Sequence, residues 1–286
     1  MDLASVLGHD FTTDPLSSEK LTLLLSHELI DHGPVLCYIV GRLTYPSLLA
    51  IGDTSKTDAT CNRPCLFVAL QRAASIYQRS LGSVSQRLMK DDPGVHFIDI
   101  SAWLKLKFLE CDPTKTHESP CFQVAEDLCT YLTDQISDFF HEYSGMNKVV
   151  TMVFDDVTVL LDLGVPLSRI HQLVYSNIQS GTNKFPNIHL ILGCHVGKLL
   201  DDSWASESDP SFAHWIDLLR SRANRVIDLR PLTTGYTTAV DGELAIREAF
   251  SSAEPKRSTD GIRTFHYLCD SRRVLCYPPG TSKLIT

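Results

Sequence analysis

Two adjacent carboxylates, Asp155 and Asp156, directly follow the apolar run from Val149 to Phe154. An uninterrupted apolar run with β-branched valines is typical of a central parallel strand, so both carboxylates should lie at its carboxyl end. Nucleotide hydrolases hold Mg²⁺ at this position through an acidic side chain. A structural interpretation is equally open, because Asp156 or Thr158 can cap the following helix. We treat Asp155 and Asp156 as a marker of the fold and predict no catalytic residue.

A nucleotide hydrolase of this layout also needs a phosphate-binding loop after its first strand. In the G-x-x-x-x-G-K-[S/T] loop, backbone amides wrap the phosphates, the lysine reaches them and the hydroxyl holds Mg²⁺. The first expected strand, 20–25, is followed by the sequence SHELIDHGP at 26–34. This stretch has no lysine, a single glycine, two carboxylates and a proline that lacks an amide donor. The sequence therefore predicts no cofactor and no enzyme activity for this chain.

The other motifs are weaker. The segment GCHVGKL at 193–199 contains Gly-Lys after a strand, but its spacing is one residue short and its last residue cannot ligate a metal. A structural zinc site needs a full set of convergent ligands, and the sequence has no paired C-x₂-C motifs, so we predict no metal. A G-x-S-x-G nucleophile motif is also missing. The potential ligand pairs are Cys61 with Cys65, His117 with Cys121, and His266 with Cys269.

The hydrophobic pattern predicts alternating strands and helices. Strands are expected at 20–25, 65–70, 95–100, 149–154, 188–192 and 225–229. Helices are expected at 34–49, 77–88, 125–143, 167–178 and 210–219. Gly41 and Pro46 would break or kink the first of these helices. The stretch 103–120 is expected to be irregular and polar, and turn signals at 240–243 and 269–272 predict antiparallel strands near the end.

This order of elements predicts an α/β fold. Helices should flank a mainly parallel, twisted sheet in three layers, with an antiparallel β extension at the C-terminal edge. The length of 286 residues fits one domain. We expect that domain to span 1–286, with a polar leader at 1–18 and a hairpin-rich part at 230–286.

Composition limits the classes of function. The formal net charge of −8 argues against a nucleic-acid binder acting alone, so any RNA contact must be local or shared with partners. Nine scattered cysteines, an odd number, predict free thiols rather than a secreted disulfide framework. No apolar run approaches the ~20 residues of a bilayer span, and the start resembles no signal peptide. We expect no membrane contact and a location in the cytosol, with the nucleus as a second compartment.

Several runs together resemble the Elongator complex protein 6 family, whose members are RecA-like subunits. The resemblance is strongest in the Asp-Asp strand and in the stretch that leads to Asp241-Gly242, and it extends unevenly from Lys20 to Ser282. It is weak at 52–64, 101–121 and 201–211. The runs that carry it are KLTLLL, VVTMVFDDVTVLLDLG, IHLILGC, NRVIDLRPLTTGYTTAVDGELAI and YLCDSRRVLCYPPGTS.

The resemblance implies a RecA-like fold and a hetero-hexameric ring made with Elongator complex proteins 4 and 5. It also implies that the ring binds tRNA and joins the Elongator catalytic core, which modifies uridine at the wobble position of the anticodon. The chain would then be a non-catalytic scaffold subunit. In RecA-like rings the loop after the strand following the Asp strand faces the pore, and here it is 194–209. Lys198 is the only Lys or Arg of that loop, and Lys198, Arg220 and Arg222 are the expected RNA contacts.

Two other interpretations stay open. An active RecA-type ATPase, such as a recombinase paralogue, would have a divergent nucleotide site at Asp155 and would need a cation that reaches the phosphates, which the first strand does not offer. An unrelated adaptor with a similar sheet is the second, because a fold alone does not fix function. The three cations named above can equally be surface residues that only solubilise the chain.

Overall fold

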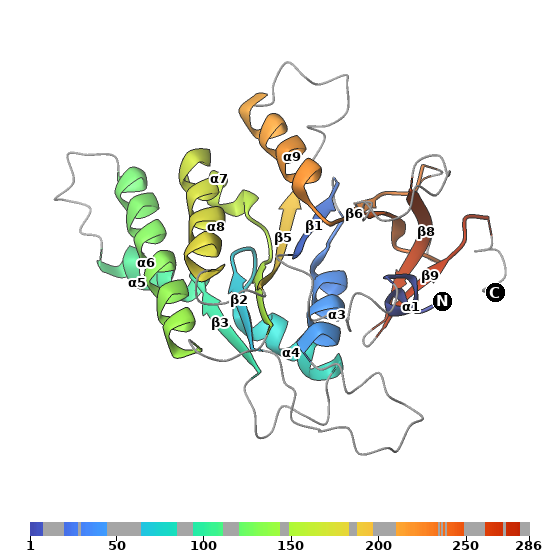
Figure 1. The fold of residues 1–286 in the computed structure, drawn as a ribbon, viewed down its shortest axis with the longest axis horizontal. Coiled ribbons are helices and arrows are strands. Elements are labelled where there is room, and N and C mark those ends of the chain that lie inside the picture. Colours follow the sequence, from blue (N-terminus) through green and yellow to red (C-terminus); the bar gives the residue numbers. More distant parts are fainter. Residues whose placement is uncertain are drawn as a thin grey trace.

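The computed structural model describes most of the chain (Figure 1). The described residues are 1–7, 20–27, 30–44, 64–84, 94–110, 120–143, 149–182, 188–196, 210–233, 235, 237, 239–248, 261–270 and 273–280. The helices are α1 (Leu3–Leu7), α3 (Gly33–Thr44), α4 (Ala74–Val84), α5 (Ile100–Glu110), α6 (Pro120–Glu142), α7 (Thr158–Asp162), α8 (Leu167–Thr182) and α9 (Pro210–Arg222). Among the helices of these ranges, none combines the length and apolar content needed to cross a bilayer.

The strands form one continuous sheet in the order β3-β2-β4-β5-β1-β6-β7-β8-β9. From β3 to β6 every neighbouring pair is parallel, and from β6 to β9 every pair is antiparallel. The α/β class, the mainly parallel sheet and the antiparallel C-terminal extension are therefore confirmed. The strands are β1 (Lys20–Ser26), β2 (Cys65–Ala69), β3 (Val95–Asp99), β4 (Val150–Phe154), β5 (Ile188–His195), β6 (Arg225–Arg230), β7 (Gly242–Glu248), β8 (Ile262–Cys269) and β9 (Val274–Tyr277).

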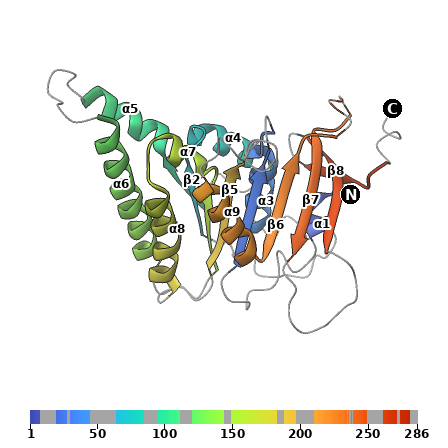
Figure 2. The ribbon, with the colours of Figure 1, turned by 90° about the horizontal axis from the view of Figure 1, so that it is seen from above.

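Helices cover both faces of the parallel part of the sheet (Figure 2). Because successive strand residues point to opposite faces of the sheet, β1 contributes residues to both hydrophobic clusters. Leu23 and Leu25 pack in the cluster that contains α6, α8 and α9, whereas Leu24 packs in the cluster with α1, α3 and α4. A strand buried on both faces has to be apolar throughout, which explains the uninterrupted runs seen in the sequence.

The first predicted helix is α3, and its boundaries follow from local chemistry. Pro34 stands in the first turn, where a missing amide and a fixed φ are tolerated. Gly41 lies inside the helix without breaking it, and its position is buried. The helix ends at Thr44, ahead of Pro46.

The prediction that 103–120 is irregular and polar is wrong at its beginning, where α5 follows β3 directly. Asp99 starts this helix by accepting hydrogen bonds from the Ser101 hydroxyl at 2.6 Å and the Ala102 amide at 3.2 Å. Apolar residues lie all around α5 rather than on one face, so no helical period was visible in the sequence.

The polar leader predicted at 1–18 is wrong for its first residues, because Leu3, Val6 and Leu7 are buried in the core. The ammonium group of Met1 donates to the carbonyl of Cys276 at 2.7 Å, and the Cys276 amide donates back to Met1 at 2.6 Å. Residues 8–18 lie outside the described residues. The start of the chain therefore pairs with β9 and contributes to the fold.

Candidate functional site

The carboxyl ends of β1, β4 and β5 meet where the chain connections change sides of the sheet. β1 leads into α3 on one face, whereas β4 and β5 lead into α7 and α9 on the other face (Figure 1). Open α/β sheets bind ligands outside the carboxyl ends of their strands at such a switch point. This edge is where a nucleotide would be held, and Asp155 and Asp156 both lie there.

Asp155 is fully buried, and four donors of the chain occupy its carboxylate. The amides of Leu70 and Asp156 donate to Oδ1, each at 2.7 Å. The amide of Gln71 and the hydroxyl of Tyr77 donate to Oδ2 at 3.0 and 2.7 Å. Asp155 thus fastens the end of β4 to the segment after β2 and to α4, and it faces no open space.

Burial sets the protonation of this cluster. Burial raises the pKa of Asp155 above its ordinary value, and the hydrogen bonds from Leu70, Tyr77, Gln71 and Asp156 oppose that rise. Burial, and then the nearby carboxylate of Asp155, raise the pKa of Tyr77 well beyond that of a free phenol. Tyr77 is therefore a neutral hydrogen-bond donor at physiological pH.

Asp156 is also buried, and it organises the start of α7. Its Oδ1 accepts hydrogen bonds from the Thr158 amide at 3.0 Å and the Thr158 hydroxyl at 2.5 Å. A third donor, the His195 amide, lies 3.3 Å away and ties β5 to the same carboxylate. The N-cap residue of α7 is Val157, which has no side-chain cap, so neither Asp156 nor Thr158 is the N-cap that the sequence suggested, and the Asp156 carboxylate instead supports the turn that leads into α7.

A buried network of Ser26, His32 and His195 fills the switch point. His32 Nε2 lies 2.6 Å from the Asp155 carbonyl, which can only accept, so Nε2 carries the proton. The Ser26 hydroxyl lies 2.8 Å from His32 Nδ1 and 3.2 Å from His195 Nδ1. Ser26 is fully buried and His32 is 1% exposed, so neither side chain is open to a substrate. Sequence analysis missed this network, whose only signal was polar residues just after strand ends.

Gly193 in β5 makes the close approach of β4 and β5 possible. A Cβ atom at this position would lie 1.7 Å from the Asp155 carbonyl oxygen and 3.0 Å from His32 Nε2. The carbonyl of Gly193 also accepts a hydrogen bond from the Val157 amide at 2.9 Å. Close packing of β4 and β5 therefore explains why a glycine stands at the start of the Gly-Lys motif.

The start of α3 offers little to a phosphate group. The Gly33 amide donates to Asp31 Oδ1 at 2.9 Å, and Pro34 has no amide proton. The Leu36 amide donates to the His32 carbonyl within the chain. Asp31 Oδ2 pairs with the Arg72 guanidinium at 2.9 Å, so the cation nearest to this turn is already engaged. A helix N-terminus binds anions through free amides, and this one has lost most of them.

A charged cluster closes the end of β6. His27 Nε2 lies 2.7 Å from Asp228 Oδ1, and Arg230 donates to Asp228 Oδ2 at 2.6 and 3.1 Å. Burial alone would raise the pKa of Asp228, but its interactions with His27 and Arg230 outweigh that effect and lower the pKa. Asp228 is therefore ionised at neutral pH and holds the β1 and β6 ends together.

Of the expected RNA contacts, Arg220 and Arg222 lie within the described residues, on the last turn of α9. Lys198 lies outside the described residues, and the preceding strand β5 ends at the carboxyl edge of the sheet. Arg220 and Arg222 lie at the end of α9, next to the start of β6 and thus at the opposite edge. Arg220 lies 3.5 Å from Asp217, and the Arg222 guanidinium lies 5.9 Å from the centre of the Tyr175 ring.

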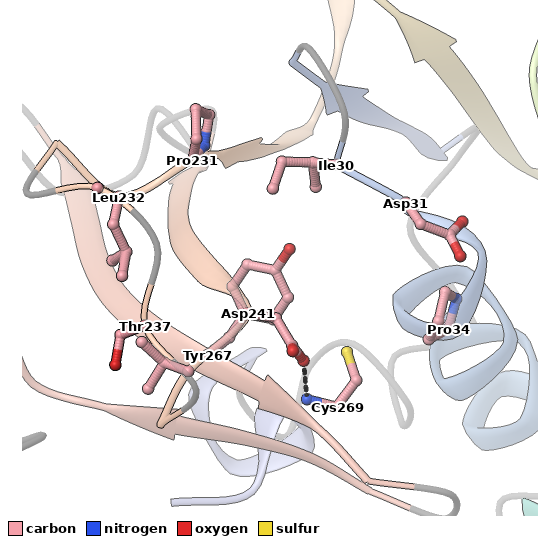
Figure 3. Close-up of a pocket in the computed structure, with 11 residues that line it drawn as sticks. Ile30, Asp31, Pro34, Pro231, Leu232, Thr237, Asp241, Tyr267 and Cys269 are labelled. Atoms are coloured by element: carbon pink, nitrogen blue, oxygen red, sulfur yellow. Dashed lines mark hydrogen bonds between the residues drawn. The ribbon is translucent and has the colours of Figure 1, made fainter.

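A cavity of about 630 Å³ opens beside the start of α3 (Figure 3). It lies between the β1–α3 connection, the segment after β6 and the end of β8, so it is next to the closed switch point. Asp241 stands at its wall and accepts a hydrogen bond from the Cys269 amide at 2.6 Å. The lining residues are Ile30, Asp31, Pro34, Pro231, Leu232, Gly235, Thr237, Val240, Asp241, Tyr267 and Cys269.

The potential metal ligands give no metal centre in the described ranges, where no three His, Cys, Asp or Glu side chains converge on one point. Cys61 and His117 lie outside the described residues, and so does the side chain of Cys121. The thiols of Cys65 and Cys269 are both free.

Comparison with known proteins shows the fold but no family. No protein-family model and no curated protein sequence matches the chain. An uncharacterized Pyrococcus horikoshii protein, PH0321, solved in complex with an unknown peptide, has a similar structure at a TM-score of 0.51 and 11% identity, covering 93% of this chain and 94% of that one. The flagellar accessory protein FlaH of Methanocaldococcus jannaschii superposes with a TM-score of 0.46 at 13% identity over 89% and 88% of the two chains. The chain thus has a RecA-like fold.

Proposed function

We propose that the chain is a non-catalytic RecA-like subunit that works by assembly with other RecA-like chains. The partners suggested by the sequence resemblance are Elongator complex proteins 4 and 5, in a hetero-hexameric ring that binds tRNA and supports wobble-uridine modification by the Elongator core. In this proposal the chain contributes shape and contacts, and another subunit performs the chemistry.

The observation that carries the proposal is that the chain's own groups occupy its nucleotide position. His32 spans from Ser26 to the Asp155 carbonyl across the switch point. The Asp155 carboxylate, where an ATPase would hold Mg²⁺, already accepts four hydrogen bonds. A phosphate group would have to displace buried, satisfied groups, and each such loss is expensive.

Exposed apolar side chains on α5 support an assembly role. Leu106, Phe108 and Leu109 are 62%, 64% and 84% exposed. Large apolar side chains that gather on a surface commonly mark a protein contact. Half of the exposed large hydrophobic residues in the described part of the chain lie on this one helix.

Reconstitution tests the partners directly. The full chain would be co-expressed with Elongator complex proteins 4 and 5, and the mass of the product measured by native mass spectrometry. We expect a complex containing all three chains. A stable interface buries on the order of 1,600 Å², and the partner chains would cover that surface of this chain. A chain that stays monomeric in this mixture would contradict the ring proposal.

Nucleotide titration separates the proposal from an ATPase. The isolated full chain would be titrated with a non-hydrolysable ATP analogue and Mg²⁺ by calorimetry. We expect no binding in the micromolar range, because most amides at the start of α3 are engaged or missing and Arg72 is already paired with Asp31. Submicromolar binding that is lost in Asp155→Asn would instead favour a divergent ATPase.

The RNA contacts need the assembled ring. Lys198→Glu and Arg222→Glu would be compared in tRNA binding at several salt concentrations, with Arg169→Glu on α8 as a control that carries the same charge change. Removing one phosphate contact should lower the salt dependence of binding by about one counterion. Unchanged binding in both test variants would remove these residues from the proposed RNA surface.

A further inference from the structure

The cavity beside α3 is a built site rather than a gap between loops. Its volume of about 630 Å³ lies within the range of ligand pockets. Segments far apart in the sequence form it: the β1–α3 connection, the segment after β6 and the end of β8. Most of its walls are apolar, and they are made by Ile30, Pro34, Leu232 and Val240. A mostly apolar pocket with a few polar groups is the usual form of a small-ligand site.

Tyr267 is the first polar group of this cavity. Its side chain is almost completely buried, at 1% exposure, yet its hydroxyl finds no hydrogen-bond partner among the described residues. Figure 3 shows the phenol ring beside Asp241, with Ile30 across the same space. Because Tyr267 lines the cavity, its hydroxyl is available to hydrogen-bond with a group that enters there.

Asp241 is the second polar group and gives the cavity its charge. One carboxylate oxygen accepts the Cys269 amide, and no cation pairs with Asp241 among the described residues. Asp31 also lines the cavity, but Arg72 neutralises it at 2.9 Å. Burial raises the pKa of Tyr267, and Cys269, Asp241 and Asp31 add to that rise, in this order. An anion such as a nucleotide phosphate is disfavoured here, whereas a cation is attracted.

We propose that this cavity binds a guanidinium or ammonium group carried on an apolar stem. The cation would pair with the Asp241 carboxylate and the Tyr267 hydroxyl would accept a hydrogen bond from it, while Ile30, Pro34 and Leu232 cover the stem. This chemistry has two sources, a free small amine or guanidine and an Arg or Lys side chain of a partner protein. The proposal is independent of ring assembly, because every group involved lies within this chain.

A series of three small probes tests the charge preference on the isolated full chain. n-Butylguanidinium, n-butanol and n-butyl phosphate share the same stem and differ only in charge. Methyl signals of Ile30 and Val240, followed by NMR during each titration, report binding at the cavity. We expect the guanidinium to bind with millimolar affinity, the alcohol more weakly, and the phosphate not at all. A guanidinium that leaves both methyl signals unmoved, or a phosphate that binds as well, would overturn the proposal.

Two variants test the anchors. Asp241→Asn keeps an oxygen for the Cys269 amide and removes the charge, and it should weaken n-butylguanidinium binding about tenfold, the loss expected for a hydrogen bond to a charged group. Tyr267→Phe should weaken it by about threefold to tenfold. Asp217→Asn on the exposed surface of α9 is the matched control and should leave binding unchanged. Equal affinities in Asp241→Asn and Asp217→Asn would refute the role of Asp241.

The assembled complex distinguishes the sources of the cation. If a partner's Arg or Lys fills the cavity, n-butylguanidinium binding should disappear on assembly and return when the partner is removed. If the natural ligand is a free amine or guanidine, the probe should bind the complex and the isolated chain equally well. A failure to assemble would count against the proposed ring, and the titrations of the isolated chain would still decide the cavity proposal.

Discussion

Two neighbouring regions at the carboxyl edge of the sheet treat their polar groups in opposite ways. At the ends of β1, β4 and β5, Ser26, His32, Asp155 and Asp156 are buried and bonded to one another or to the backbone. Beside α3, Tyr267 and Asp241 line a cavity, and within the described residues the Tyr267 hydroxyl has no hydrogen-bond partner and Asp241 has the Cys269 amide but no paired cation. The usual ligand position of the fold is closed, and the adjacent one is open.

This contrast teaches that the usual ligand position of a fold need not be the place where a given chain can bind a ligand. The switch point keeps the acidic strand end that marks the fold, but its carboxylates now hold β2, β4, β5 and α7 together. The open cavity depends on the C-terminal antiparallel strands, which lie outside the alternating β-α part. Substitutions should therefore change stability in the closed region and ligand binding in the open one.

The largest effect should come from Asp155→Ala. This change leaves four buried donors unpaired, and we expect a loss of about 4 kcal/mol or more in the free energy of unfolding. Asp31→Ala is the matched change in the open region, where the carboxylate is part of a half-exposed pair and caps α3, so it should cost about 1 kcal/mol. Urea unfolding of both variants measures the difference. Similar losses would contradict the contrast between the two regions.

A pair of glycine substitutions gives the next largest effect. Gly193→Ala would place its Cβ 1.7 Å from the Asp155 carbonyl, a backbone atom that cannot move alone. We expect a loss of about 3 kcal/mol in the free energy of unfolding, since overpacking a buried site forces the backbone apart. A Cβ at Gly33 would come closest to the end of the Asp31 side chain, at 3.0 Å, so Gly33→Ala should cost about 1 kcal/mol or less. Chemical denaturation would rank the pair, and the reverse order would show that β4 and β5 can separate freely.

The free energy of unfolding should depend on pH through the cluster of His27, Asp228 and Arg230, which lies between the two regions. The folded pKa of Asp228 is lowered, so its stabilisation is present above the ordinary aspartate pKa of about 3.9 and is lost as the pH falls through the folded value. Asp228→Asn should therefore be about 1 to 2 kcal/mol less stable than the unmodified chain at neutral pH, and the difference should shrink below about pH 4. Urea midpoints between neutral and acid pH measure this. Asp217→Asn, on the exposed α9 surface, should show no such pH-dependent difference, and a gap that widens in acid would reverse the sign of our argument.

The sequence predicted most of the parallel core because each signal was local. The apolar run 149–154 with its two carboxylates identified β4, and helical spacing identified α6 and α8. It could not predict α5, because the apolar residues of this helix are spread around its axis and leave no helical period to detect. It could not predict α1 either. A helix of five residues is too short to show a helical period, so its three buried residues could not be recognised in the sequence.

The site was only partly predictable for a related reason. The absence of a phosphate loop is readable from nine consecutive residues, 26–34, so the sequence alone could suggest a closed nucleotide position. The way in which it is closed depends on His32 meeting Asp155 and on Ser26 meeting His195, contacts that only the folded chain creates. The open cavity likewise joins Ile30 to Tyr267, which no local pattern connects.

The smallest effect is also the most discriminating, because it compares two buried tyrosines of equal exposure. Tyr77 and Tyr267 are each 1% exposed, but the Tyr77 hydroxyl donates to Asp155 at 2.7 Å whereas that of Tyr267 has no partner in the described residues. Tyr77→Phe should therefore lower the free energy of unfolding by about 1 to 2 kcal/mol, and Tyr267→Phe should change it by less than about 0.5 kcal/mol. Both changes remove one oxygen and leave the ring in place, so packing cancels between them. Paired urea unfolding curves measure the difference, and an equal loss in both variants would mean that the chain itself satisfies the Tyr267 hydroxyl, leaving no polar anchor there for a ligand.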